Sequence, residues 1–198
     1  MSEPVVRPGG RTARVREAVL AVAGDMLAES GVEGVDLAEV ARRAGVGRTT
    51  VYRRWGTVPT LVADLLVDMA ETSVPRTETG SLLGDLRANA TLVCTTLADR
   101  RQGPLFAAII AAATCDERTA AALQHFYDVR IAEWAPCVDA AVDRGEAPVG
   151  TDAAAVIRAV SAPLYHQLLT RTEPLDQALA DTAARAALAA VEAGVFVR

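Results

Sequence analysis

The feature that most constrains this chain is the stretch 36–55, DLAEVARRAGVGRTTVYRRW. Asp36, with an acid three residues later, has the spacing of a capping box, in which each side chain accepts a backbone N–H of the other's turn. Gly45 has the position of a left-handed residue that ends a helix. A second short helix is expected over 47–55. The stretch therefore predicts two short helices joined by a tight turn, the helix-turn-helix unit that binds DNA.

The second helix of this unit concentrates arginine and hydroxyl side chains on its outer face, while Val51 and Trp55 face inward. Arg48 is the candidate for base readout, because a guanidinium can bond to guanine O6 and N7 together. The other polar side chains would contact thymine methyls or phosphate, which positions the helix without reading sequence. The residues predicted to contact DNA here are Asp36, Gly47, Arg48, Thr49, Thr50, Tyr52, Arg53 and Arg54.

The charge distribution supports this interpretation. Five arginines and no acid lie between Val40 and Ala63, a cluster of one sign that suits phosphate. Residues 1–56 hold nine arginines and seven acids, whereas residues 57–198 hold eleven arginines and eighteen acids. DNA should therefore meet one end of an otherwise acidic protein. An ordinary solvent-exposed pair of helices is the alternative interpretation of the cluster.

The stretch resembles the N-terminal DNA-binding segment of the TetR family of bacterial transcriptional regulators. The shared pattern is an Ala-x-x-Ala-Gly-Val run and a Thr-Val-Tyr run before an aromatic residue, present here as Ala41, Ala44, Gly45, Val46, Thr50, Val51, Tyr52 and Trp55. The resemblance extends upstream over residues 16–34 and, in length and architecture, over the whole chain. Three positions depart from it: Asp36 replaces a usual Thr, Gly47 a common Ser, and Val58 a frequent phosphate-contacting Lys.

The whole chain is predicted to be all-α, because hydrophobic residues make up 51% of it, aromatic residues only 4%, and no segment sustains strand-like alternation. We expect about nine helices in a three-helix DNA-binding domain and a larger helical bundle. The expected divisions are a flexible arm at 1–11, the helix-turn-helix domain at 12–56, a connecting helix at 57–75 and an effector-binding and dimerisation domain at 76–198. Arg11 and Arg14 could reach a neighbouring minor groove, as basic arms do.

Helical spacing of apolar residues sets the expected helices, and Pro136 should kink the longest of them. Their expected ranges are 12–29, 36–44, 47–55, 57–73, 81–97, 105–113, 116–144, 151–171 and 174–193. The last two carry small apolar faces that could pair with a second copy into a four-helix bundle. In the TetR family these helices usually form the dimer interface. The candidate interface residues are Val156, Val160, Leu164, Leu168, Leu179, Ala183 and Ala186.

The family resemblance also implies a ligand cavity in the helical body, whose occupancy changes the separation of the two DNA-reading units. Polar or aromatic residues on otherwise apolar helices are the candidates for its lining: Phe106, Tyr127, Trp134, Tyr165 and His166. Each could equally be a packed core aromatic or, for His166, a hydrogen-bonded interface histidine. Few charges are expected inside, so the effector should be apolar or aromatic rather than a polyanion.

Other classes of function find little support in the sequence. The three cysteines are widely spaced, and His125 and His166 lack a nucleophile motif or metal-ligand spacing, so we expect no catalytic residue, metal or cofactor. We expect no signal peptide, because residues 1–10 lack an apolar core, and the longest apolar run, 105–113, is too short to span a bilayer. Both observations favour the cytoplasm. The expected function is a DNA-binding regulator, and most often in this family a repressor, that binds a palindromic operator as a homodimer and responds to a small molecule. The alternatives are a DNA-binding regulator without an effector, recruited by a protein or architectural, and a small helical enzyme.

Overall fold

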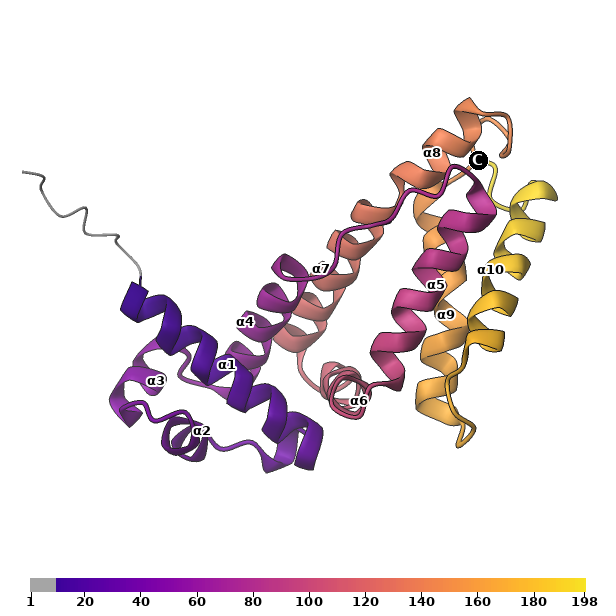
Figure 1. Cartoon of the computed structure of the whole chain (residues 1–198). Helices are drawn as coiled ribbons and strands as arrows, with labels where there is room; N and C mark the ends of the chain where they lie inside the picture. The colour runs from indigo at the N-terminus through magenta and orange to yellow at the C-terminus, as the bar shows by residue number, and fades with distance from the viewer. Residues whose placement is uncertain (1–9) are drawn as a thin grey trace, which may run out of the picture.

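The computed structural model describes residues 10–198, so most of the expected arm at 1–11 lies outside the described residues. Within residues 10–198 the chain is all-helical, which confirms the predicted class (Figure 1). The elements are α1 (Gly10–Ser30), η1 (Val32–Gly34), α2 (Leu37–Arg43), α3 (Arg48–Arg54), α4 (Val58–Glu71), α5 (Leu82–Ala98), α6 (Gln102–Ala113), α7 (Glu117–Trp134), α8 (Pro136–Asp143), α9 (Ala153–Thr170) and α10 (Gln177–Glu192). No helix in this part of the chain has the length and apolar character needed to cross a membrane.

The N-terminal unit consists of α1 to α3 with the first turns of α4. Helix α1 lies across α2 and α4, and its buried residues meet those of the other helices (Figure 1). Val19, Val40, Val51 and Leu61 contribute completely buried side chains, one from each helix. Helices as short as α2 and α3 are unstable alone, so this shared core holds them in place.

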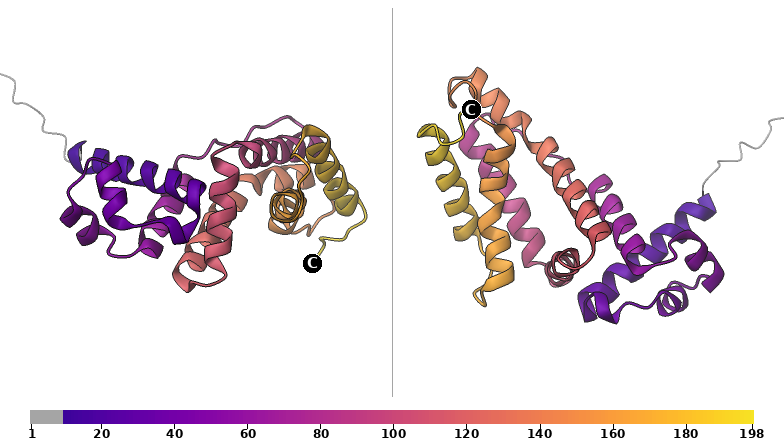
Figure 2. Two further views of the ribbon diagram at one scale, coloured as in Figure 1. Left: turned by 90° about the horizontal axis from the view of Figure 1, so that it is seen from below. Right: turned by 180° about the vertical axis from the view of Figure 1, so that it is seen from behind.

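The larger body is built around α5, α9 and α10, which pack on one another side by side. Helix α6 runs across the end of this group, and α7 leads from the N-terminal unit to α8 at the far end (Figures 1 and 2). Helix α10 lies on the side farthest from the N-terminal unit in both figures. One face of α9 and α10 is therefore left open at that side.

Two contacts join the N-terminal unit to the body. Helix α4 packs along α7, and α1 packs on α6. At the second contact Arg101 Nε donates to Asp25 Oδ1 at 2.5 Å, and Arg101 Nη2 donates to the Ala21 carbonyl at 3.1 Å. Arg101 directly precedes α6, so the start of this helix is tied to the middle of α1.

Three expected helices differ most from those observed, and one of them is α6, which begins at Gln102 rather than at 105. The helix expected over 116–144 divides at Pro136 into α7 and α8, so residues 10–198 contain ten α-helices where about nine were expected. The last helix begins at Gln177 rather than at 174, because the Asp176 carboxylate caps it by accepting the Leu179 N–H at 2.8 Å.

The expected dimer residues also need correction. Four of the seven are buried inside the protomer and offer no surface to a partner: Val156, Val160, Leu164 and Ala183. Leu168 and Leu179 are partly buried against the same core, and of the seven only Ala186 is exposed. Their helical spacing marks a buried face, but that face packs on α5 and on the neighbouring helix of the same chain.

Candidate DNA-binding surface and ligand cavity

The start of α2 is capped by Asp36, whose Oδ1 accepts the N–H groups of Ala38 and Glu39, both at 2.9 Å. Glu39 does not complete the expected capping box. Its carboxylate instead binds Arg42, with Oε2 2.7 Å from Nε, and Arg43, with Oε1 2.9 Å from Nε. These hydrogen bonds lower the pKa of Glu39 to about 2. Glu39 therefore compensates the charge of two arginines in the predicted cluster, and Arg43 also pairs with Glu29.

The turn between α2 and α3 follows the predicted chemistry. Gly45 has a φ of +64°, a conformation that glycine adopts without steric cost. The Val46 N–H donates to the Ala41 carbonyl at 2.9 Å, which closes the end of α2 as a Schellman turn. Gly47 is the N-cap residue of α3 and provides no side-chain cap.

Helix α3 presents one buried face and one polar face. Val51 is buried, as is Trp55 directly after the helix, while Thr50 is half-buried. Tyr52 is 44% exposed, although it is a large aromatic side chain. The remaining predicted contact residues of α3 are all exposed: Arg48, Thr49, Arg53 and Arg54.

The arginines of α3 differ from those of α2 in their partners. Within residues 10–198, Arg48, Arg53 and Arg54 form no ion pair, unlike the two arginines of α2. Arg54 instead stacks over the Trp55 ring, with its guanidinium carbon 5.0 Å from the ring centroid. Arg14 is exposed on the first turns of α1, and Arg11 lies inside α1 rather than in an arm. The positive surface available to a phosphate backbone therefore centres on α3.

A partly buried network holds this helix against α1 and α4. Asp64 of α4 accepts the Trp55 Nε1–H at 2.9 Å and the Arg16 Nη2–H at 2.8 Å. Arg16 also pairs with Asp68, one turn further along α4. Burial alone would raise the pKa of Asp64, but the hydrogen bonds from Arg16 and Trp55 outweigh it and lower the pKa. The carboxylate therefore stays charged and joins three helices at one point.

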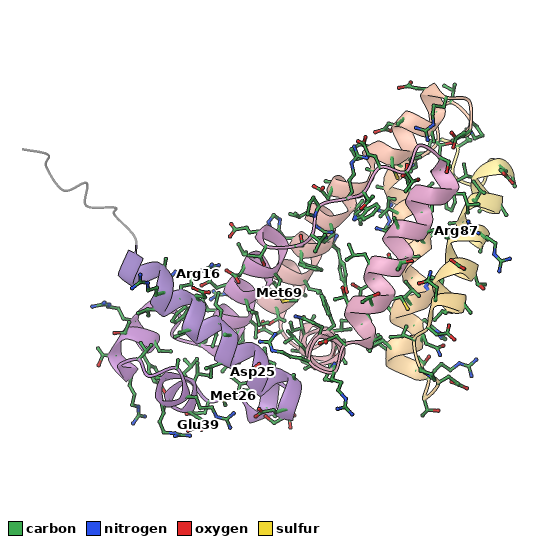
Figure 3. All side chains as sticks on the ribbon, in the orientation of Figure 1. Arg16, Asp25, Met26, Glu39, Met69 and Arg87 are labelled. Atoms are coloured by element: carbon green, nitrogen blue, oxygen red, sulfur yellow. The ribbon has the colours of Figure 1, made fainter. Side chains whose placement is uncertain are left out.

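A cavity of about 840 Å³ lies in the body between the end of α4 and helices α5, α6, α7 and α9. It brings together four of the five predicted lining residues: Phe106, Tyr127, Trp134 and Tyr165. His166 is excluded from the lining and is exposed, because it follows Tyr165 directly and so points to another side of α9. Met69 of α4 also lines the cavity (Figure 3).

The lining is mostly apolar, and its phenols are uncharged near neutral pH. Burial raises the pKa of Tyr127 to about 12 and that of Tyr165 well above its ordinary value. The two rings meet edge to face, with centroids 5.4 Å apart. These hydroxyls can bind a polar ligand atom only as neutral groups.

Sequence reasoning missed the other polar residues of the cavity, among them Arg130, Asn89 and Gln102. Asn89 had a signal that could have been used, since it follows Leu86 by three residues and precedes Val93 by four on the expected buried face of its helix. Arg130 had no such signal.

These two parts define a class of protein: a helix-turn-helix DNA-binding protein whose helical body contains a ligand-sized cavity. Comparison with known proteins agrees with this description. Residues 19–63 match the model of bacterial regulatory proteins of the tetR family, and residues 76–187, more than half of the chain, match the tetracyclin repressor-like C-terminal domain.

Individual relatives cover most of the chain. It is 33% identical over 150 residues to the HTH-type transcriptional regulator AqdR of Rhodococcus erythropolis, spanning 74% of this chain and 70% of that protein. It is 30% identical over 170 residues to the DNA-binding transcriptional repressor TetR of Mycobacteroides abscessus, spanning 81% and 85%. The crystal structure of the TetR family transcription regulator SCO0332 superposes with a TM-score of 0.68 at 27% identity, covering 89% of this chain and 98% of that one.

The chain belongs to the TetR family and is a transcriptional regulator with a helix-turn-helix DNA-binding domain. The resemblance inferred from residues 36–55 is thereby confirmed.

Proposed function

We propose that the protein is a repressor that binds a palindromic operator as a homodimer and leaves it when a small molecule occupies the cavity. The observation that carries the DNA-binding part is the exposure of Arg48, Arg53 and Arg54 on α3, none of which forms an ion pair within residues 10–198. Repression is supported by similarity to the DNA-binding transcriptional repressor TetR of Mycobacteroides abscessus.

A recognition helix of seven residues contacts few base pairs, so specific binding calls for a second copy. The open face of α9 and α10 suits such a partner. Its exposed residues are mostly small and recur at helical spacing: Pro163, His166, Ala178, Thr182, Ala186 and Ala189. Small residues let helix axes approach closely, and an isologous pairing of this face makes a four-helix bundle. In that arrangement His166 is an interface residue rather than a ligand contact.

Effector release is supported by the position of the cavity. It is lined by α4, which continues from the DNA-binding unit, and by α6, which packs on α1. A ligand that shifts either helix therefore changes the position of the DNA-binding unit that contains α3. For an effector to act, it must bind the two arrangements of these helices with different affinity.

Selection of bound fragments from random duplex DNA tests the proposal and gives the operator. An inverted repeat with half-sites about 34–36 Å apart supports the dimer. In a mobility-shift titration, Arg48→Ala should cost about 1–3 kcal/mol and relax specificity at one base pair. Arg87→Ala is the matched control, because Arg87 lies on α5 beside α10, away from α3 (Figure 3).

The proposal is contradicted if R48A binds the operator as tightly as the wild-type protein does. A regulator without an effector remains the second candidate, and it would show no release by any member of a metabolite panel. An enzyme would protect no palindromic fragment in a footprint.

A further inference from the structure

Arg130 of α7 is a half-buried cation without a carboxylate partner in residues 10–198. Its guanidinium donates to the Ser73 hydroxyl and, at 3.1 Å, to the Val74 carbonyl, both just after α4. Glu133, the acid one turn away, forms no ion pair with Arg130; its charge acts on Arg130 only from a distance, and its Oε1 accepts the Arg76 N–H at 3.1 Å. Burial lowers the pKa of Arg130, which reflects the cost of holding this charge away from water. An anion beside it would offset that cost.

The space next to Arg130 is walled by aromatic rings. Phe106, Phe126, Tyr127 and Tyr165 form a closed cycle of neighbouring rings, with centroids 5.4 to 6.2 Å apart. All four line the cavity, as does Arg130. Such a wall offers ring edges and faces to a flat aromatic molecule.

Asn89 provides an independent sign of a ligand. This cavity-lining side chain is only 3% exposed, and its Oδ1 finds no hydrogen-bond partner within the described chain. The Gln102 Oε1, also in the lining, is buried and unpartnered in the same way. A buried amide left unpaired is costly, so these groups call for a polar partner inside the cavity.

The charge of the lining favours a ligand with one negative charge. Asp99, the one carboxylate among the lining residues of 10–198, uses its Oδ1 to accept the N–H groups of Arg101 and Gln102, at 2.9 and 2.8 Å. Arg158 is exposed on α9, so its charge is solvated. A cation would meet Arg130 unfavourably, and a polyanion would find only one desolvated partner.

We propose that the cavity binds an aromatic monocarboxylate, with its rings against the four aromatic side chains, its carboxylate on Arg130 and a further polar atom at Asn89. The inference rests on the proposed effector function and names the effector's class. A carboxylate competes for the N–H groups of Arg130 that otherwise bind Ser73 and Val74, because a guanidinium binds an ionised, bidentate acceptor more strongly than a neutral oxygen. Occupancy thereby loosens the tie between α7 and the end of α4, the helix whose first turns hold the DNA-binding unit.

The test is calorimetric titration of the full chain, without DNA, with three probes: benzoate, 2-naphthoate and 2-anthroate. Each is compared with its primary amide, which has the same shape without the charge. At least one carboxylate should bind about 10- to 100-fold more tightly than its amide, the factor expected for hydrogen bonds to a charged group. Arg130→Gln should abolish this preference, and Arg130→Lys, which keeps the charge, should retain part of it. Arg158→Gln, which changes the exposed arginine of the same lining, should leave it intact.

Three results would overturn the assignment: amides that bind as tightly as the carboxylates, a preference that survives R130Q but is lost in R158Q, or no carboxylate that binds below about 1 mM. If R130Q does not fold, the carboxylate–amide comparison in the wild type and in R130K decides. Release of operator DNA is measured separately. A carboxylate that binds with the expected preference but releases no DNA contradicts the proposed effector function and leaves the ligand class standing.

Discussion

Replacing Asp64 by alanine removes the carboxylate that joins α1, α3 and α4. The Trp55 Nε1–H loses its acceptor. Because Trp55 is only 4% exposed, water cannot replace that acceptor. Arg16 loses a forked contact, with Nε and Nη2 at 3.1 and 2.8 Å from Asp64 Oδ1. It keeps its pair with Asp68 and a 3.2 Å hydrogen bond from Nη2 to the backbone carbonyl of residue 64. The substitution should therefore destabilise the N-terminal unit and weaken the packing of α3 against α1 and α4.

The size of the effect follows from the number and exposure of these bonds. A hydrogen bond to a charged group contributes about 1.5–3 kcal/mol when buried. The Asp64 side chain is 26% exposed and that of Arg16 is 22% exposed, so solvent reduces the ion-pair part to about 1 kcal/mol. We expect Asp64→Ala to lower the free energy of unfolding by about 2–4 kcal/mol in total. At about 2–4 °C per kcal/mol for a chain of this length, the melting temperature should fall by about 5–15 °C.

The same contact should depend on pH in a definite direction. The folded-state pKa of Asp64 lies below its ordinary value of 3.8, so the stabilisation is fully present above that value and is lost as the pH falls through the folded pKa. The difference in stability between the wild type and Asp64→Ala should be constant near neutral pH and should shrink in acid below about pH 4.

Thermal unfolding followed by circular dichroism at several pH values measures both effects. Asp64→Asn is a matched variant, because it keeps an acceptor for Trp55 but loses the charge that Arg16 binds, and it should cost about half as much. Asp68→Asn removes one partly exposed ion pair and should cost less than about 1 kcal/mol. If D64A destabilises the protein no more than D68N, or if its effect grows toward acid pH, Asp64 is not the junction of these helices.

Three further variants test other parts of the proposal. Arg53→Ala should weaken binding to all duplexes alike and reduce the slope of log affinity against log salt by about one, measured in mobility shifts at several salt concentrations. Ala186→Glu places a charge on the open face of α10 and should give a monomer in analytical ultracentrifugation at micromolar concentration, with loss of operator binding. Arg101→Ala removes the partly exposed contact to Asp25 and should cost less than about 1 kcal/mol of stability, yet reduce the ligand-induced loss of DNA affinity in the same mobility-shift assay.

The DNA-binding unit could be predicted closely because its signals are local. A cap, a left-handed glycine and the spacing of Val51 and Trp55 each constrain a few neighbouring residues, and the observed turn satisfies all of them. The partner of Glu39 could not be predicted this way. Its carboxylate could accept either the Asp36 backbone N–H or the N–H groups of two arginines one turn ahead. Only the folded geometry shows that it binds the arginines.

The body was harder to predict because helical spacing shows that a face is buried but not what covers it. Val156, Val160 and Leu164 satisfy the same pattern whether they meet a second protomer or, as observed, helices of their own chain. Tyr165 and His166 show the same limit, since they are neighbours on one helix and only its rotation puts the first in the cavity. Arg130 could not be identified at all without knowing that α7 crosses the end of α4.

Helix α4 is the element through which the two sites can influence each other. In its middle and penultimate turns, Asp64 and Asp68 are bound by Arg16 and Trp55 of the DNA-binding unit. Beyond its end, Ser73 and Val74 are held by Arg130 from the cavity wall. The first set is a charged network that stays ionised near neutral pH, whereas the second joins a cation to two neutral acceptors. An anionic ligand competes only with the weaker set, so occupancy should release the cavity end of α4 while its DNA end remains attached and transmits the displacement to α3.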